Sequence, residues 1–501
     1  MKILRDVLWY NTAKCLAIAL SILRGLFLAK LLGPSAFGIW SVFHLTLKYS
    51  DSSHLGFRHA VNREVPILRG RGETAASDEV LGVGFFWNMV LTLAAGTGVF
   101  LWGSYSFGDN SVYQYGFQVT AGVIVLAQLT SFLNTTLRVN REFQLFGVMT
   151  VVAEALTFTF FLLLVPFWGV MGALTALALS YALYLCLFAG LRPATIVFLA
   201  SVCKKDVSKA KDLLKIGFPV VIFSLLVVGL YTIDKLLVLK ILGRHAFGMY
   251  SFAGVVVSLL LVVVGNIDYV LYPSLGEEFG KEMSGKLRAY VVLSSTAFAH
   301  LCAPCIAVGA LILPWILLTF FPEYLESLLP MALLMVGSYF LVFTSIPASS
   351  LIVMNRYVGY GLFSVGAVLL NAAFTLLFLR VVGEIWGAAL GAALSYAGFG
   401  IARYLYALIR LKMSLRESLL ELAKNVVPLL FNSAVVAVVL WTAGGLPFLR
   451  FSGHLSLPET LVAVMAVLVL NLPFFYYVDR QTRIFRRIGA VLFPHASMSS
   501  H

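Results

Sequence analysis

The sequence predicts an all-α polytopic membrane protein of about fourteen transmembrane helices, and two observations support this class. The first is composition: the 501 residues are 60% hydrophobic and only 12% charged, with a mean hydropathy of +0.93. Apolar runs near the roughly 20 residues that cross about 30 Å of hydrocarbon recur throughout the chain. These runs are continuous rather than alternating, which argues against a β-barrel.

The second observation is an internal repeat. The phrase LAKLLGPSAFGIWSV at 28–42 returns as VLKILGRHAFGMYSF at 238–252, with seven of fifteen positions identical. A second pair is GALTALALSYA at 172–182 and GAALGAALSYA at 387–397. The chain therefore contains two related halves. Paired repeats in a membrane protein are typical of transporters whose substrate site lies between the repeats.

Each membrane segment is placed by an apolar run bounded by polar loops. The fourteen predicted segments are 9–32, 37–58, 81–103, 115–137, 144–166, 170–191, 215–240, 246–272, 289–316, 328–353, 358–380, 384–409, 425–444 and 458–478. With a cytoplasmic N-terminus, every inner loop is basic, whereas the outer loops hold only Arg244, Arg380 and Arg450. Inner loops collect Lys and Arg, so an even helix count with both termini in the cytoplasm is predicted.

The repeats divide the chain. Six segments separate the two copies, so both halves insert in the same orientation, as parallel repeats. We expect an N-terminal six-helix lobe at 1–191, a cytoplasmic linker at 192–214, a second six-helix lobe at 215–410, and two added helices with a basic tail at 411–501. The stretch VSKAKDLLKIG, which begins in the linker, predicts a short amphipathic helix on the cytoplasmic surface.

Several function classes are disfavoured. The longest outer loops hold about a dozen residues, too few for the external platform that a glycosyl polymerase or ligase usually needs, so an enzyme is not expected. The net charge of +13 is explained by the basic inner loops, and nucleic acid is not an expected partner. The single CxxC, Cys302 to Cys305, lies in an apolar segment without a second pair and predicts no metal or redox site.

A nucleotide is also not expected as the energy source. Residues 280–287 have the GxxxxGK spacing of a P-loop, but Leu287 stands where Ser or Thr would bind Mg²⁺. Neither the strand before nor the nucleotide-binding domain around such a loop is present. No cofactor is expected, which leaves an ion gradient (H⁺ or Na⁺), the membrane potential or the substrate gradient to supply the energy.

Ionisable residues inside the predicted segments are the candidate functional residues, because each costs several kcal/mol within a bilayer. The basic candidates are Lys14, Arg24, Lys48 and Arg58, and the remaining candidates are Asp51, Glu154, Asp234, Asp268 and Arg403. Helical spacing puts the first two on one side of segment 1, and Lys48, Asp51 and Arg58 on one stripe of segment 2. Structural pairing, such as Lys48 with Asp51, explains single members, whereas the whole set favours a polar pathway.

The repeat suggests partners for these charges. Shifting the first copy by 210 residues places Arg24 opposite Asp234, and Arg58 opposite Asp268. The first half is therefore cationic where the second is anionic. We hypothesise that these residues form or exchange ion pairs across the two halves.

Three phrases resemble the polysaccharide transporter (Wzx-type flippase) branch of the multidrug/oligosaccharidyl-lipid/polysaccharide (MOP) exporter superfamily. They are LLGPSAFGIWSV, LLKIGFPVVIF and YTIDKLLVLKILGRHAFGMYSFA, and the resemblance covers about 1–410. It implies two six-helix lobes around a central cavity in the bacterial cytoplasmic membrane. It also implies that an undecaprenyl-pyrophosphate-linked oligosaccharide (an O-antigen, capsule or exopolysaccharide unit) moves from the inner to the outer leaflet by alternating access.

Under this resemblance, Lys14, Arg24, Lys48 and Arg58 would hold the pyrophosphate by charge-assisted hydrogen bonds. The acidic candidates and Arg403 would serve coupling or inter-lobe pairing. The expected partners are the lipid-linked oligosaccharide, membrane lipids, H⁺ or Na⁺, and other membrane proteins of polysaccharide assembly. Four alternatives stay open: a cation-coupled multidrug exporter of the same superfamily, a lipid II flippase, a glycosyl polymerase or ligase, and a non-transporting assembly scaffold.

Overall fold

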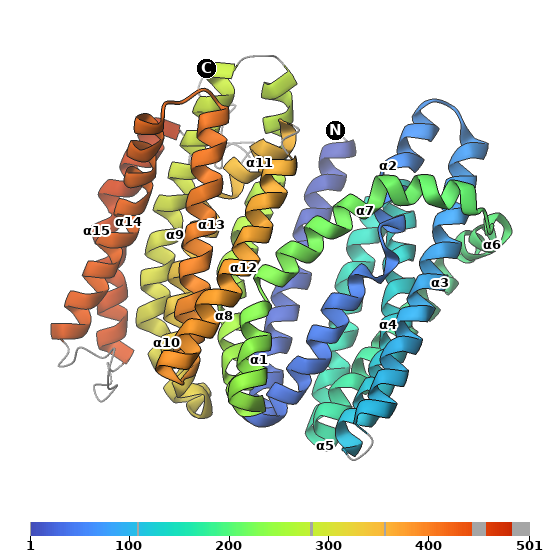
Figure 1. Cartoon of the computed structure of the whole chain (residues 1–501), viewed down its shortest axis with the longest axis horizontal. Coiled ribbons are helices and arrows are strands. Elements are labelled where there is room, and N and C mark those ends of the chain that lie inside the picture. Colours follow the sequence, from blue (N-terminus) through green and yellow to red (C-terminus); the bar gives the residue numbers. More distant parts are fainter. Residues whose placement is uncertain (1, 108–109, 281–283, 355–356, 443–456, 483–501) are drawn as a thin grey trace. The chain divides into compact units, whose positions relative to one another are not determined.

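The computed structural model describes residues 2–107, 110–280, 284–354, 357–442 and 457–482 (Figure 1). Within these ranges, side chains are described except at 2–8, 10–11, 259–280, 284–286, 352–353, 357–358, 360, 442, 457, 477–479 and 481–482. Every regular element in this part of the chain is helical, so the predicted all-α class is confirmed.

The helices are defined in chain order. They are α1 (Lys2–Ser50), the 3₁₀ helix η1 (Asp51–His54), α2 (Phe57–Gly70), α3 (Thr74–Ser106), α4 (Ser111–Val139), α5 (Phe143–Leu191), α6 (Pro193–Val202), α7 (Val207–Leu230), α8 (Ile233–Gly280), α9 (Ser284–Phe320), the 3₁₀ helix η2 (Pro322–Ser327), α10 (Leu328–Phe343), α11 (Ser345–Val353), α12 (Tyr357–Val382), α13 (Ile385–Arg410), α14 (Leu415–Thr442) and α15 (Leu457–Thr482).

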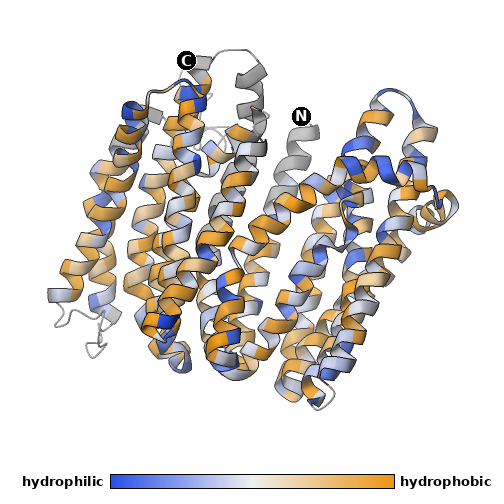
Figure 2. Ribbon diagram, in the orientation of Figure 1, coloured by the Kyte–Doolittle hydropathy of each residue, from blue (hydrophilic) through white to orange (hydrophobic). Residues whose placement is uncertain are grey.

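Within the described residues, eleven helices are long and apolar enough to cross a membrane. Hydrophobic residues dominate the lengths of the long helices in Figure 2. Two of them, α1 and α5, each cover two predicted segments and kink where the segments were separated. The kinks are at Gly33 (φ 67°) and Gly169 (φ 52°), a backbone region that glycine reaches at little cost. The total of fourteen spans stays a prediction.

The chain forms two compact units. Unit 1 comprises Met1–Thr232 and Arg244–Gly248, and unit 2 comprises Ile233–Gly243 and Met249–His501. In unit 1, α1 packs along α5, α3 packs on α4, and α2 packs on α3 and α7. Fully buried apolar side chains from these helices, among them Phe57, Phe132 and Tyr184, form the core of the unit.

A second feature of unit 1 is a close crossing of the two repeated phrases. A Cβ on Gly38 would lie 2.0 Å from the carbonyl oxygen of Arg244, and a Cβ on Gly248 would lie 1.9 Å from that of Pro34. These two contacts are equivalent under the 210-residue offset. The offset also relates Ser35 to His245, whose Oγ and Nδ1 share a hydrogen bond of 3.0 Å. The repeated LGxxAFG phrase is therefore a packing signature that requires glycine on both sides.

Helix α7 lies on α2 through another glycine pair. A Cβ on Gly217 would lie 2.0 Å from the carbonyl oxygen of Gly56, which itself has a φ of 107°. The predicted segment 215–240 is interrupted after α7, where Tyr231 and Thr232 form a turn. The Thr232 hydroxyl donates to the carbonyl of Val228 at 2.6 Å and lies 2.6 Å from the Tyr49 hydroxyl. Such side-chain bonds compete with the helical pattern, and apolar periodicity alone did not reveal the break.

In unit 2, small residues let neighbouring helices approach closely. A Cβ on Gly391 would lie 2.5 Å from the backbone nitrogen of Thr375 in α12, and one on Gly400 would lie 2.5 Å from the carbonyl oxygen of Phe340 in α10. Both glycines lie on α13, where the phrase GAALGAALSYA is located. Small residues at membrane helix interfaces permit such backbone approach, so this phrase is also a packing signature.

The added helices α14 and α15 pack on α9. Between them, Asn432 and Asn471 form a reciprocal pair: each amide nitrogen donates to the other amide oxygen, at 3.0 and 2.9 Å. Both side chains are buried. Each also donates to the carbonyl four residues earlier, Pro428 or Val467.

We predict that Asn432→Leu destabilises the added helix pair by about 1–3 kcal/mol, because the Asn471 amide then loses its partner in an apolar surrounding. The double variant Asn432→Leu with Asn471→Leu should recover most of this loss, since neither polar group is then left unpaired. The measurement is the thermal unfolding midpoint of the detergent-solubilised protein. Additive losses in the double variant would contradict the pairing.

Candidate functional site

The central candidate is Arg24, on α1 before its kink. Its Nη1 lies 2.6 Å from Oε2 of Glu154 on α5, and its Nη2 donates to the Ser21 hydroxyl at 3.2 Å. The guanidinium carbon also lies 5.6 Å from the centre of the Phe161 ring. The side chains of Arg24 and Glu154 are 19% and 28% exposed, so the pair is shielded but still reachable. A charge at this depth is tolerated because it has a carboxylate and a hydroxyl as partners.

Arg24 lies beside a narrow groove between α1 and α5 that has no room for a water molecule. The rest of the groove lining is apolar: Phe27, Leu28, Leu31, Phe158, Phe161, Leu162 and Val165. Phe27 and Leu31 remain 47% and 44% exposed. One cation beside an apolar wall suits an amphiphilic anion rather than a fully water-soluble one.

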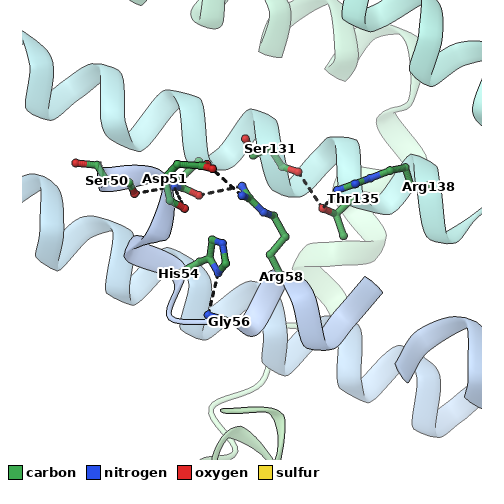
Figure 3. Close-up of polar contacts among 9 residues, drawn as sticks. Ser50, Asp51, His54, Gly56, Arg58, Ser131, Thr135 and Arg138 are labelled. Carbon is green, nitrogen blue, oxygen red and sulfur yellow. Dashed lines mark hydrogen bonds and ion pairs between the residues drawn. The ribbon is translucent and has the colours of Figure 1, made fainter. Parts of the chain in front are cut away.

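A second polar cluster surrounds the end of α1 and η1 (Figure 3). The Arg58 guanidinium of α2 lies 3.1 Å from Oδ1 of Asp51 and 3.3 Å from the Gln128 amide oxygen of α4. Gln128 also donates to the backbone carbonyls of Ser50 and Asp51, at 2.9 and 3.0 Å. It therefore connects α4 to the last turn of α1. The Arg58 side chain is 12% exposed, whereas that of Asp51 is 63% exposed, so the carboxylate is open to exchange.

The turn that positions Arg58 depends on His54 and Gly56. Leu55 has a φ of 45° and Gly56 a φ of 107°, so the chain reverses direction between η1 and α2. The buried His54 ring accepts a hydrogen bond from the Gly56 backbone nitrogen at 2.9 Å through Nδ1 (Figure 3). Burial and the Arg58 charge lower the pKa of the neighbouring His59, so His59 is neutral at pH 7. The positive charge at this turn belongs to arginine.

The other two basic candidates of unit 1 lie on α1. Lys14 is half-buried in the part before the kink, and Lys48 is exposed near the end. His44, four residues before Lys48, stacks on Trp40 with 5.9 Å between ring centres. Unit 1 therefore holds all four predicted headgroup residues, together with Asp51 and Glu154.

In unit 2, Asp234 lies in the first turn of α8 and is 1% exposed. Its Oδ2 accepts a hydrogen bond from the Tyr250 hydroxyl at 2.6 Å, and this bond joins the two parts of α8 across the kink at Gly243. Its Oδ1 is buried and has no hydrogen-bond partner among the described residues. Lys235 is turned toward Gly254, where a Cβ would lie 2.8 Å from its Nζ. The side chain of Asp268, also on α8, lies outside the described residues.

Arg403 of α13 is placed against the break between α10 and α11. Its Nε donates to the Thr344 hydroxyl at 2.7 Å and its Nη2 to the Leu341 carbonyl at 2.5 Å. The guanidinium also lies 4.9 Å from the centre of the Phe399 ring. These contacts give Arg403 a helix-bracing position. Of the groups around the site, sequence reasoning missed Gln128, which carries no charge, so the search for ionisable residues passed over it.

Comparison with known proteins identifies the family. The family described as "Polysaccharide biosynthesis protein" matches residues 27–330, more than half of the chain. No curated protein sequence matches the chain.

Three solved structures share its fold. The lipid II flippase MurJ, in an inward closed conformation, has a TM-score of 0.64 at 14% identity, over 93% of this chain and 98% of that one. An inward-facing multidrug resistance MATE family transporter has a TM-score of 0.63 at 14% identity, over 81% and 96%. A MOP superfamily transporter from Pyrococcus furiosus, described by the reverse polarity of its binding pocket, has a TM-score of 0.55 at 14% identity, over 82% and 96%. All three are transporters or flippases rather than enzymes. This chain therefore belongs to the polysaccharide biosynthesis protein family, with the fold of the MOP superfamily transporters.

Proposed function

We propose that the protein is a flippase that moves an undecaprenyl-pyrophosphate-linked oligosaccharide from the inner to the outer leaflet of the bacterial cytoplasmic membrane by alternating access. The family match supports a role in polysaccharide biosynthesis, and the fold supports transport. Both termini would then lie in the cytoplasm, as the basic inner loops predict. Other membrane proteins of polysaccharide assembly are the expected neighbours in the cell.

The observation that carries this proposal is Arg24 in its apolar groove. A pyrophosphate on an isoprenoid tail needs a guanidinium for its oxygens and an apolar wall for the first units of the chain. In the absence of substrate, Arg24 forms an ion pair with Glu154. When substrate binds, the more strongly charged pyrophosphate replaces the Glu154 carboxylate as the partner of Arg24. Arg58 offers the same exchange, because its partner Asp51 is largely exposed. Lys14 and Lys48 extend the cationic path along α1.

Asp234 is our candidate for the coupling residue. A buried carboxylate oxygen without a hydrogen bond is costly unless it is protonated or binds a cation. Binding of H⁺ or Na⁺ at this oxygen would remove the cost and link an ion gradient to the conformation of α8. The exchange of Arg24 with Asp234, and of Arg58 with Asp268, stays a hypothesis for the transport cycle, in which Arg403 acts as a brace.

Depletion of the protein in its native host tests the function. We expect an undecaprenyl-linked oligosaccharide to accumulate on the cytoplasmic face of the membrane. Chemical analysis of lipid-linked intermediates, with surface-specific labelling of the glycan, measures this. Normal export of all surface glycans after depletion would overturn the proposal.

Asp234→Asn tests the coupling. We expect flipping to lose its response to the ion gradient while protein abundance stays within about twofold, because asparagine keeps the shape and the hydrogen bond to Tyr250 but cannot take up a proton. The measurement is flipping in proteoliposomes with imposed pH or Na⁺ gradients. Tyr250→Phe is the comparison variant: it removes the hydrogen bond that Asp234→Asn keeps and it retains the carboxylate, so its response to the gradient should persist. An unchanged gradient response in Asp234→Asn would exclude Asp234 as the coupling residue.

Two rivals have specific support. The buried Asp234 and the MATE-like fold also suit a cation-coupled multidrug exporter, which would change dye or drug efflux rather than glycan intermediates on depletion. The MurJ-like fold suits a lipid II flippase, for which lipid II would accumulate instead. The predominance of basic over acidic candidates on α1 favours an anionic lipid over a cationic drug, and the family match favours the oligosaccharide lipid over lipid II.

A further inference from the structure

Helix α6 is too short to cross a membrane and is almost entirely apolar. Its ten residues, PATIVFLASV, span about 15 Å, half of the hydrocarbon thickness. It begins at Pro193, directly after Arg192, which pairs with Glu142 at 2.6 Å. An apolar helix of this length, next to a basic residue and outside the spanning helices, is typical of a helix that lies along a membrane surface.

One side of α6 is packed against unit 1 and the other side is open. Leu199 is 2% exposed and joins the core of the unit. The backbone of Val202 approaches α3 so closely that a Cβ on Gly82 would lie 1.8 Å from its carbonyl oxygen. On the open side, Ile196 is 38% and Val197 is 68% exposed. The helix is thus held rigidly while it presents aliphatic side chains outward.

Lysines follow this open face directly. Lys204 and Lys205 are exposed in the connection to α7, and Lys211 is exposed near the start of α7. Two neighbouring lysines are already neutralised: Lys209 pairs with Glu79, and Lys215 pairs with Asp212. Within the described part of the chain, no ion pair forms with Lys204, Lys205 or Lys211.

We propose that the open face of α6 and the three lysines, Lys204, Lys205 and Lys211, form a binding surface for anionic phospholipids. The aliphatic side chains insert at the boundary between headgroups and acyl chains, and the lysines bind the phosphodiesters above it. A soluble polyanion could form ion pairs with the lysines, but it would leave the aliphatic side chains of Ile196 and Val197 exposed to water. This surface is separate from the groove at Arg24, so it does not depend on the substrate that the protein carries.

The position of α6 is tested by site-directed labelling. In a background without the five native cysteines, Val197→Cys carries an environment-sensitive fluorophore in proteoliposomes. The label should be quenched by spin-labelled lipid and protected from aqueous iodide. Ser208→Cys, on the exposed side of α7, is the comparison position. Iodide quenching of the Val197 label equal to that of a free fluorophore in water would overturn the insertion.

The lysines are tested by lipid retention. The double variant Lys204→Gln with Lys205→Gln should retain dioleoylphosphatidylglycerol roughly 25-fold more weakly than wild type, about fivefold per lysine. Native mass spectrometry in detergent measures this, with dioleoylphosphatidylcholine as the zwitterionic comparison. The matched control is Lys412→Gln with Arg416→Gln, two exposed basic residues of unit 2.

Two outcomes of this experiment would overturn the proposal. One is an equal loss of phosphatidylglycerol in both double variants, which would indicate a general effect of net charge. The other is full displacement of the lipid by glycerol 3-phosphate, which would show that the lysines bind a free phosphate without contribution from α6. Retention that falls only in the Lys204 and Lys205 variant, and resists glycerol 3-phosphate, is the expected result.

Discussion

Alanine at Gly248 should destabilise unit 1 by about 1–3 kcal/mol, because the crossing of the repeated phrases has no space for a side chain. The added Cβ would lie 1.9 Å from the Pro34 carbonyl oxygen and 2.9 Å from the Gly38 backbone nitrogen. Both obstacles are backbone atoms, so no rotamer change can relieve the clash. Gly38→Ala should have a similar effect, since its Cβ would lie 2.0 Å from the Arg244 carbonyl oxygen.

The measurement for both variants is the thermal unfolding midpoint in detergent, together with the amount of monodisperse protein from membranes. Gly122→Ala is the matched control, because Gly122 also lies within a helix of unit 1 and has no atom within 4 Å of an added Cβ. Alanine there should be neutral or slightly stabilising, given its better helix propensity. A Gly248 variant as stable as the Gly122 variant would contradict the close crossing.

Local structure was the part of the fold that the sequence predicted best. The predicted repeat is also visible in the backbone, because Gly33 and Gly243 share a φ near +75° (67° and 83°). The packing of Gly38 against the segment that holds Gly248 could not be predicted, because similarity between two segments does not say that they touch. The break at Thr232 was missed for a related reason: one of the two contacts of its hydroxyl is with Tyr49, 183 residues away.

Candidate charges were found more readily than their partners. An arginine within an apolar run can be recognised from the sequence alone, but the identity of its counterion depends on which helix packs beside it. Arg24 contacts Glu154, which is 130 residues distant, whereas the repeat offset had suggested Asp234. Arg403 illustrates a second limit. Its partners include the backbone carbonyl of Leu341. Every residue has such a carbonyl, so the amino-acid type at position 341 could not indicate this contact.

The Arg24 and Glu154 pair allows structure and transport to be separated. We expect Arg24→Gln to reduce flipping roughly tenfold or more, since one charge-assisted hydrogen bond to a pyrophosphate is worth about 1.5–3 kcal/mol. It should also cost about 1–3 kcal/mol in stability, because Glu154 is left without its cation in a shielded site. Flipping of lipid-linked oligosaccharide in proteoliposomes and the thermal midpoint in detergent measure the two effects.

The double variant Arg24→Gln with Glu154→Gln decides between the roles. Two glutamines form a neutral hydrogen-bonded pair, so stability should return to near the wild-type value. Flipping should stay low, since no cation remains to hold the pyrophosphate. Arg192→Gln with Glu142→Gln is the matched control: the same residue types pair at the same 2.6 Å, but they flank the two ends of α5 and lie outside the groove lining. If flipping recovers in the Arg24 double variant, Arg24 has only a structural role. If both double variants lose flipping equally, the loss does not come from the proposed headgroup path.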